Sequence, residues 1–219
     1  MARLVFEKTG NAVWISHLDL MRLFQRAFKR AGLPLKHTQG FNPRPSVSIA
    51  LPLSVGVESF CELLDFEIEG ELPPMEEIRD RLNNALISGV KVISVSHGGK
   101  KLRDLSLLAC EIYLEYDNGV GEEAVSKIRK LFSSEALLVA KKSKNGPVEQ
   151  NIIPMIKKLL VGQRDSNTIC IEALICCQNP SMNPMQIAGA VSRYLPEVTA
   201  DHSRCCRMEI YDSEIKVFR

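Results

Sequence analysis

The sequence predicts an α+β protein made of two tandem ferredoxin-like units with antiparallel sheets. Three observations lead to this fold class. Strand and helix patterns follow one another in the order β-α-β-β-α-β over residues 1–97, which is the split-βαβ order. The same order recurs over residues 105–219, after a linker that contains two glycines and two lysines in a row. A chain of 219 residues, 45% of them hydrophobic, can fill one large or two small cores.

The first predicted helix, residues 16–31, is marked at both ends. Ser16 and Asp19 fit a capping box, in which the hydroxyl and the carboxylate each bind a free backbone N–H. Gly32 follows the last periodic residue and Pro34 lies just beyond it, which is typical of a helix end. Apolar residues at helical spacing predict one buried face, made by Leu20, Phe24, Ala27 and Ala31.

The rest of the first unit follows the same alternation. A second helix begins after Pro73 and Pro74, continues to about Ile87 and stops at Gly89. The predicted strands of this unit occupy residues 2–8, 47–51, 61–69 and 90–95.

The second unit repeats this pattern without residue-by-residue identity to the first. Its predicted elements are helices at 121–132 and 183–194 and strands at 107–116, 136–140, 168–176 and 205–211. An insertion covers residues 141–163, and residues 154–161 within it are expected to form a short helix. The insertion is rich in lysine, with Lys141, Lys142, Lys144, Lys157 and Lys158.

Charge is distributed unevenly along the chain. The formal net charge of +2 excludes a wholesale polyanion binder such as a histone tail. Residues 1–50 nevertheless contain eight Lys and Arg and two Asp and Glu, whereas residues 51–100 contain four and nine. Such asymmetry indicates a charged partner.

The basic residues of the first 50 positions gather on the outer face of the first helix and on the loop that follows. Glycine and two closely spaced prolines predict that this loop, residues 36–45, is exposed and stiff. Cations with an exposed aromatic side chain are typical of a surface that binds RNA. The alternative is that the charges only solvate the helix. The predicted RNA-binding residues are Arg22, Arg26, Lys29, Arg30, Lys36, His37, Phe41, Asn42 and Arg44.

His17 is the one candidate for a catalytic residue. A helix start surrounded by cations disfavours an imidazolium, so a neutral His17 could act as a general base in metal-independent RNA cleavage. The alternative is a structural histidine that serves the helix cap. No second residue stands out as the general acid.

Other chemistry has no motif in this chain. The seven cysteines include no Cys-x-x-Cys pair, so we expect buried thiols, no metal and no cofactor. Glycine-rich phosphate-binding motifs and hydrolase motifs are also missing. There is neither a run of about 18 uncharged apolar residues nor a hydrophobic signal core, and we expect a cytoplasmic protein.

Four sequence motifs together resemble the bacterial radical-SAM-linked protein family, a domain of unknown function. They are SHLDL at residues 16–20, RAFKRAGLP at 26–34, GFNPRP at 40–45 and ALPLSVGVES at 50–59. Weaker likeness at 151–156 and 207–211 extends the match over essentially the whole chain. The resemblance implies a domain fused to the C-terminus of a radical SAM protein or encoded beside one. The chain has no Cys-x-x-x-Cys-x-x-Cys motif, so we do not expect it to hold the radical SAM cluster itself.

The leading hypothesis is therefore a non-catalytic RNA-binding accessory that presents tRNA, rRNA or a ribosomal particle to a partner enzyme. The first alternative is a protein-interaction module that docks on a radical SAM enzyme. The second is a small RNA-cleaving or RNA-modifying enzyme that uses His17. The expected partners are RNA and a radical SAM protein, with neither a membrane nor DNA among them.

Overall fold

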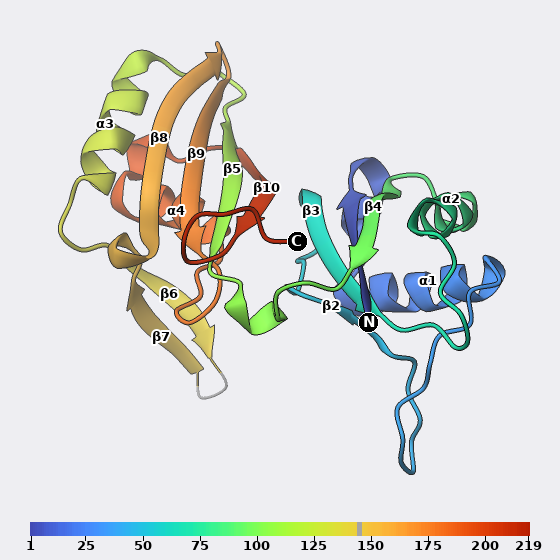
Figure 1. The fold of residues 1–219 in the computed structure, drawn as a ribbon. Helices are drawn as coiled ribbons and strands as arrows, with labels where there is room; N and C mark the ends of the chain where they lie inside the picture. The colour runs from blue at the N-terminus through green and yellow to red at the C-terminus, as the bar shows by residue number, and fades with distance from the viewer. Residues whose placement is uncertain (144–145) are drawn as a thin grey trace. The chain divides into compact units, whose positions relative to one another are not determined.

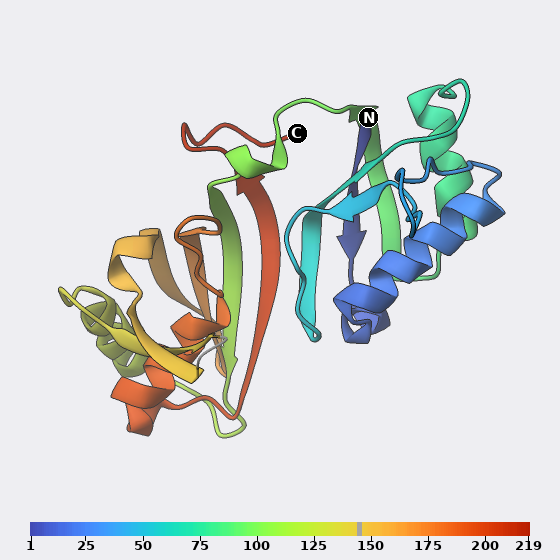
Figure 2. The ribbon, with the colours of Figure 1, turned by 90° about the horizontal axis from the view of Figure 1, so that it is seen from below.

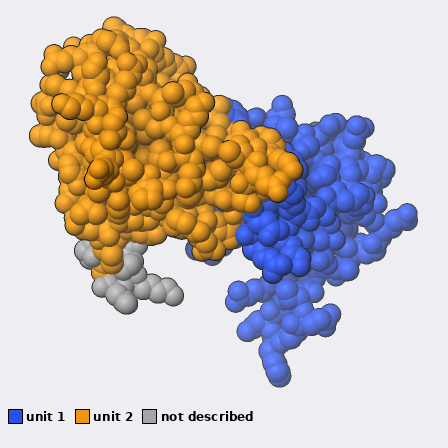
Figure 3. Space-filling view, turned by 60° about the vertical axis from the view of Figure 1, so that its left-hand side comes forward, with its two compact units in different colours: residues 1–104, 218–219 blue, residues 105–217 orange. Residues whose placement is uncertain are grey.

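The computed structural model describes residues 1–143 and 146–219, so Lys144 of the predicted insertion lies outside the described residues. The chain divides into unit 1, residues 1–104 with 218–219, and unit 2, residues 105–217 (Figure 3). Both units are antiparallel sheets with two helices, which confirms the predicted α+β class (Figure 1). Among the described residues, no helix combines the length and apolar character needed to cross a membrane.

Unit 1 has the ferredoxin-like strand order β4-β1-β3-β2, with antiparallel pairing throughout. Its second strand is very short, at three residues. The elements are β1 (Ala2–Lys8), α1 (His17–Arg30), β2 (Val47–Ile49), β3 (Val57–Phe66), α2 (Met75–Ala85) and β4 (Val90–His97).

The helices of unit 1 cover one face of its sheet, and the core lies between them (Figure 2). Aromatic side chains of α1 anchor that helix on the strands. The ring of Phe24 lies 4.7 Å from that of Phe6 on β1, and the ring of Phe28 lies 4.9 Å from that of Phe66 on β3. Leu20, Phe24 and Ala27 of the predicted apolar stripe are thus buried and Ala31 is half-buried, and this determines which face of α1 remains outside.

The opposite face of this sheet carries a buried ion pair. Arg3 on β1 stands opposite Asp65 on β3 and donates to both of its carboxylate oxygens, at 2.6 and 2.9 Å. The guanidinium also lies 5.1 Å from the ring of Phe218, near the C-terminus. This bidentate geometry offsets the desolvation of the two charges.

Unit 2 repeats the topology with the strand order β10-β5-β9-β8. A separate two-stranded hairpin, β6 (Leu138–Ser143) and β7 (Gly146–Asn151), is inserted after its first helix. The elements of the unit itself are β5 (Leu107–Glu115), α3 (Glu122–Phe132), β8 (Ile156–Asp165), β9 (Thr168–Cys176), α4 (Met185–Tyr194) and β10 (His202–Tyr211).

Two sequence predictions for residues 136–161 are wrong. Residues 136–140 were expected as the second strand of the unit, but Leu138–Ser143 pairs only within the inserted hairpin. Residues 154–161 were expected as a helix, but β8 runs through them and pairs with β9, as in the register of Val161 with Ile171. Pro154 lies in a 3₁₀ turn before the strand. Pairing along ten residues of β8 outweighs a local helical pattern that is only two turns long.

Candidate nucleic-acid interface

The N-terminus of α1 is capped by Ser16. Its hydroxyl accepts from the backbone N–H of Asp19 at 3.2 Å, as predicted. The Asp19 carboxylate does not return the bond to the backbone; it accepts from the Ser16 hydroxyl at 2.7 Å and from Arg22 at 3.1 Å. These two bonds, the Ser16 one first, lower the pKa of Asp19. Half of the expected capping box is present, and one of the predicted RNA-binding cations is paired.

The C-terminus of α1 ends in a Schellman motif. The N–H of Leu33 donates to the carbonyl of Phe28 at 3.0 Å, and that of Gly32 to the carbonyl of Lys29 at 3.2 Å. Gly32 adopts φ +67°, a conformation that favours glycine. This turn sends the chain out of the helix and into the proline-rich loop.

The loop forms an arm, which we call the finger, residues 36–46 (Figure 1). The N–H of Thr38 donates to the carbonyl of Arg44 at 2.8 Å, and that of Ser46 to the carbonyl of Lys36 at 2.6 Å. At its base, the N–H of Lys36 donates to the carbonyl of Glu67, just beyond β3, at 2.9 Å. These backbone hydrogen bonds make the finger a narrow hairpin that projects from unit 1.

Phe41 stands at the tip of the finger with its side chain fully exposed, at 106% of the reference area. Asn42 beside it is also exposed. An aromatic ring that contacts no core is unusual, because burying a Phe is favourable by about 1.5–3 kcal/mol. Nothing in the packing of unit 1 explains this residue.

The predicted RNA-binding cations fall into two groups. Arg26, Lys29 and Arg44 are exposed, and within residues 1–143 and 146–219 their side chains make no hydrogen bond or ion pair. Lys36 lies 3.7 Å from the carboxylate of Glu67. Arg22 is held by Asp19, as described above.

Arg30 is engaged differently, because its guanidinium donates to the carbonyl of Ala85 at the end of α2, at 2.6 Å. That bond braces α1 against α2. Arg30 thus has a structural role that the charge pattern did not predict.

A groove of about 460 Å³ joins the end of α1 to the base of the finger. Its floor is apolar, formed by Phe28, Leu33 and Leu35. Its rim is polar and combines Gln25 and Lys29 of α1 with His37 of the finger and Glu69. Two of the predicted residues, Lys29 and His37, thus meet at one site. Gln25 and Glu69 had no sequence signal, since neither belongs to a basic pattern.

His17 lies at the other end of α1 and is half-buried, with a buried Nδ1 that has no hydrogen-bond partner among the described residues. Twelve residues of helix separate it from Lys29, which corresponds to about 18 Å. His17 and Lys29 therefore do not belong to one site.

Large apolar side chains are exposed near this end of α1. Trp14 and Leu18 are 70% and 68% exposed, and Val55 is 53% exposed. A Cβ added at Gly56 would come within 3.6 Å of the Trp14 ring, so the loop after Val55 lies against that ring. Leu18 and Val55 fall within the SHLDL and ALPLSVGVES motifs, but no pattern in the sequence predicts that their side chains or that of Trp14 are exposed.

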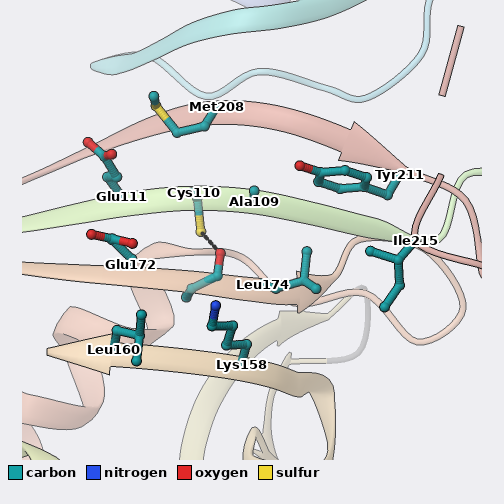
Figure 4. Close-up of a pocket in the computed structure, with 11 residues that line it drawn as sticks. Ala109, Cys110, Glu111, Lys158, Leu160, Glu172, Leu174, Met208, Tyr211 and Ile215 are labelled. Atoms are coloured by element: carbon teal, nitrogen blue, oxygen red, sulfur yellow. Dashed lines mark hydrogen bonds between the residues drawn. The ribbon is translucent and has the colours of Figure 1, made fainter. Parts of the chain in front are cut away.

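Unit 2 offers a different kind of surface. A cavity of about 470 Å³ lies over the strands of its sheet, with Met208 and Tyr211 of β10 on one side and Leu160 of β8 on the other (Figure 4). Glu111 on β5 and Glu172 on β9 are direct partners across the strands and both line it. Lys158 of β8 lines the cavity as well, so two carboxylates face one ammonium group, and the excess negative charge disfavours a phosphate backbone.

Beside that cavity, Tyr113 is flanked by two guanidinium groups. Arg204 lies 3.9 Å and Arg164 5.0 Å from the centre of its ring. Burial and the bond that its hydroxyl donates to Glu111 raise the pKa of Tyr113 to about 12. Arg204 is also bound to Glu115 at 2.7 Å, so this cluster is internally satisfied.

All seven cysteines are free thiols. Five are buried, and Cys170 and Cys177 are half-buried. In the described part of the chain, no three His, Cys, Asp or Glu side chains are grouped as a metal site would require.

The geometry defines a protein of two ferredoxin-like units, the first of which carries a cationic helix and an aromatic-tipped finger. The chain belongs to the DUF2344 family, described as an uncharacterized protein conserved in bacteria, whose model matches residues 2–184. No curated protein matches the sequence.

Similarity to solved structures concerns the fold. One is a chain of a crystal structure of a Cbf5-Nop10-Gar1 complex, with a TM-score of 0.51 and 10% identity, covering 95% of this chain and 48% of that one. The present chain thus spans about half the length of the solved one. A structure of an unknown protein from Galdieria sulphuraria is 11% identical over 94% of this chain and 96% of that one, with a TM-score of 0.27.

Proposed function

We propose that this protein is a non-catalytic RNA-binding accessory, and that unit 1 holds the RNA. The observation that carries the proposal is the combination of three exposed cations that form no close ion pair among the described residues, Arg26, Lys29 and Arg44, with a fully exposed ring at Phe41. Cations without acidic partners bind phosphates without first breaking an ion pair. The exposed ring gains contact area when it stacks on an unpaired base.

The arrangement supports RNA with single-stranded elements. Arg26 and Lys29 lie on α1, and Arg44 and Phe41 belong to the finger, so an RNA strand that crosses from helix to finger meets phosphate contacts and a ring on which a base can stack. The finger's internal hydrogen bonds hold Phe41 outward before binding, which lowers the entropic cost of ordering it. We propose tRNA or rRNA as the ligand.

We further propose that the protein acts in the cytoplasm with a radical SAM protein, as the family resemblance of its N-terminal motifs implies. A docking module for that protein is the second candidate function. The exposed apolar residues Trp14, Leu18 and Val55 favour it, because contiguous exposed apolar surface is typical of protein contacts.

Crosslinking in cells, followed by sequencing of the attached RNA, tests the first proposal. We expect wild type to recover tRNA or rRNA fragments, and the Arg26→Ala/Lys29→Ala/Phe41→Ala variant to recover far less. Lys127→Ala/Lys130→Ala, which removes two cations of α3, is the control for the lost charges and should behave as wild type. Equal recovery by all three proteins would contradict RNA binding by unit 1. A protein partner that is captured after RNase treatment, and lost in Trp14→Ala, would favour docking.

A further inference from the structure

The groove at the base of the finger is less suited to phosphate than the surfaces on either side of it. Glu69 places an exposed carboxylate on its rim. The groove also lies at the C-terminal end of α1, where the helix dipole is negative. Phosphates are therefore attracted to Arg26 on the helix and Arg44 on the finger. The groove between them is better suited to an uncharged part of the ligand.

The size and floor of the groove fit a flat, largely apolar group. Its volume of about 460 Å³ lies within the range of small-ligand sites, about 300–1,000 Å³. Phe28 and Leu33 form part of an apolar floor, and Pro45 of the finger forms a side. A nucleobase that leaves the stack presents such a group, and its faces need apolar contact.

The polar rim can read the edge of that base. Glu69 only accepts hydrogen bonds, whereas Lys29 only donates and the Gln25 amide does both. Within the described residues the side chains of Gln25, His37 and Glu69 have no hydrogen-bond partner, so all three remain available to a ligand. The site thus offers one strong acceptor beside several donors.

Among the four bases, guanine matches this set. Its Watson–Crick edge has two adjacent N–H donors, which a carboxylate can accept together, and a carbonyl acceptor next to them. Uracil places a carbonyl on each side of its single N–H, and either carbonyl would face the Glu69 carboxylate unfavourably. We propose that the groove binds the base of an unpaired guanosine, with Glu69 accepting from its N1–H and amino group and with the Gln25 amide donating to its O6, while Lys29 on the rim stays available to phosphate. This inference rests on the proposed RNA binding.

The test compares short oligouridines that carry one central guanosine, inosine or adenosine with plain oligouridine, in titrations with the full chain. We expect wild type to bind the guanosine oligomer about tenfold more tightly than plain oligouridine, as for one good bidentate base contact. Inosine, which lacks the amino group, should fall between them. Glu69→Gln should lose the preference and keep the binding of plain oligouridine.

Glu71→Gln is the matched control, because it makes the same charge change at an exposed position outside the groove. It should keep the preference for guanosine. Equal affinity of wild type for all four oligomers would overturn the guanosine site and leave RNA binding standing. Equal preferences in Glu69→Gln and Glu71→Gln would also overturn it. Absence of binding to every oligomer at low salt would overturn both proposals.

Discussion

The first helices of the two units, α1 and α3, occupy the same place in the topology but differ in how many of their cations form ion pairs. On α3, Lys127 lies 3.0 Å from Glu123 and 3.5 Å from Glu197. Arg129 lies 3.4 Å from Glu122 and also donates to the carbonyl of Val161 at 2.7 Å. The outer face of α3 therefore neutralises most of its own cations.

On α1 the balance is reversed. Asp19 is its one acidic residue; it forms an ion pair with Arg22, and Arg26 is close enough to help lower its pKa. Arg26 and Lys29 form no ion pair within 4.0 Å in the described part of the chain. The two helices bury their apolar faces in the same way, so folding does not require this difference. We infer that the cations on the outer face of α1 are there to bind a ligand. Those on α3 need no ligand to explain them, because most of them pair with acidic residues of the same unit.

The largest effect is expected from reversing the unpaired cations. The Arg26→Glu/Lys29→Glu/Arg44→Glu variant should lose at least about 100-fold in RNA affinity at low salt, because three attractive contacts become repulsive. Lys127→Glu/Lys130→Glu on α3 should leave the affinity near that of wild type. Titrations against the same RNA at one salt concentration measure both. Similar losses in the two variants would mean that net charge alone determines binding, and the contrast between the helices would disappear.

Replacing Phe41 with alanine should weaken RNA binding by about 1–3 kcal/mol, which is typical for loss of one base stack. The melting temperature should stay the same, since the side chain makes no core contact. Trp14→Ala, at another exposed aromatic residue, is the control and should leave the affinity unchanged. A Phe41→Ala variant that binds as wild type would show that the finger tip lies outside the interface.

The contrast between α1 and α3 was only partly visible in the sequence. The periodic stripe of Leu20, Phe24 and Ala27 predicts the buried face of α1, because helical spacing determines which side chains share a face. The same spacing places Arg30 among the outer cations. It does not reveal the bond from Arg30 to Ala85, since that carbonyl comes from a helix 55 residues away in the chain.

The groove and the insertion were not predicted for a similar reason. Gln25 and Glu69 line one groove because α1, the finger and the segment after β3 come together in the fold. No local sequence pattern distinguishes these two residues. β8 has a sequence compatible with a short helix, and long-range pairing with β9 decides its structure. The strand order of unit 2 therefore could be predicted, but not the segment that supplies its second strand.

Unit 2 should respond to mutation in stability and not in RNA affinity. The Tyr116 hydroxyl donates to the carbonyl of Val198 at 2.9 Å in a buried setting. Tyr116→Phe should therefore lower the free energy of unfolding by about 1 kcal/mol, measured by denaturant titration. RNA affinity should not change. A loss of RNA binding in this variant would place part of the interface in unit 2.

Alkaline pH should weaken the same unit. Burial raises the pKa of Tyr116, and burial with the bond to Glu111 raises that of Tyr113, both to about 12 from an ordinary 10.0. The folded state thus keeps these protons longer than the unfolded state does. The two tyrosines should make their full contribution to the free energy of unfolding below about pH 10, and this contribution should be lost as the pH rises towards 12. Tyrosinate absorbance and circular dichroism measured together would test this, and early ionisation of both residues without unfolding would contradict it.

A smaller effect is expected at Arg30. Arg30→Ala removes the bond to Ala85 and should lower the free energy of unfolding by about 1 kcal/mol or less. The salt dependence of RNA binding should keep the slope of wild type. If Arg30→Ala reduced the slope as strongly as Arg26→Ala does, Arg30 would also be a phosphate contact.

The salt dependence of RNA binding tests the contrast between α1 and α3 most directly. The logarithm of the association constant is measured against the logarithm of salt concentration for wild type, Arg26→Ala/Lys29→Ala and Lys127→Ala/Lys130→Ala. Each lost phosphate contact flattens this line by about 0.7 for a single strand. We expect a slope shallower by about 1.4 for the α1 variant and the wild-type slope for the α3 variant. Equal slopes in all three proteins, or no binding by wild type at low salt, would contradict the proposal that α1 and the finger form the RNA interface.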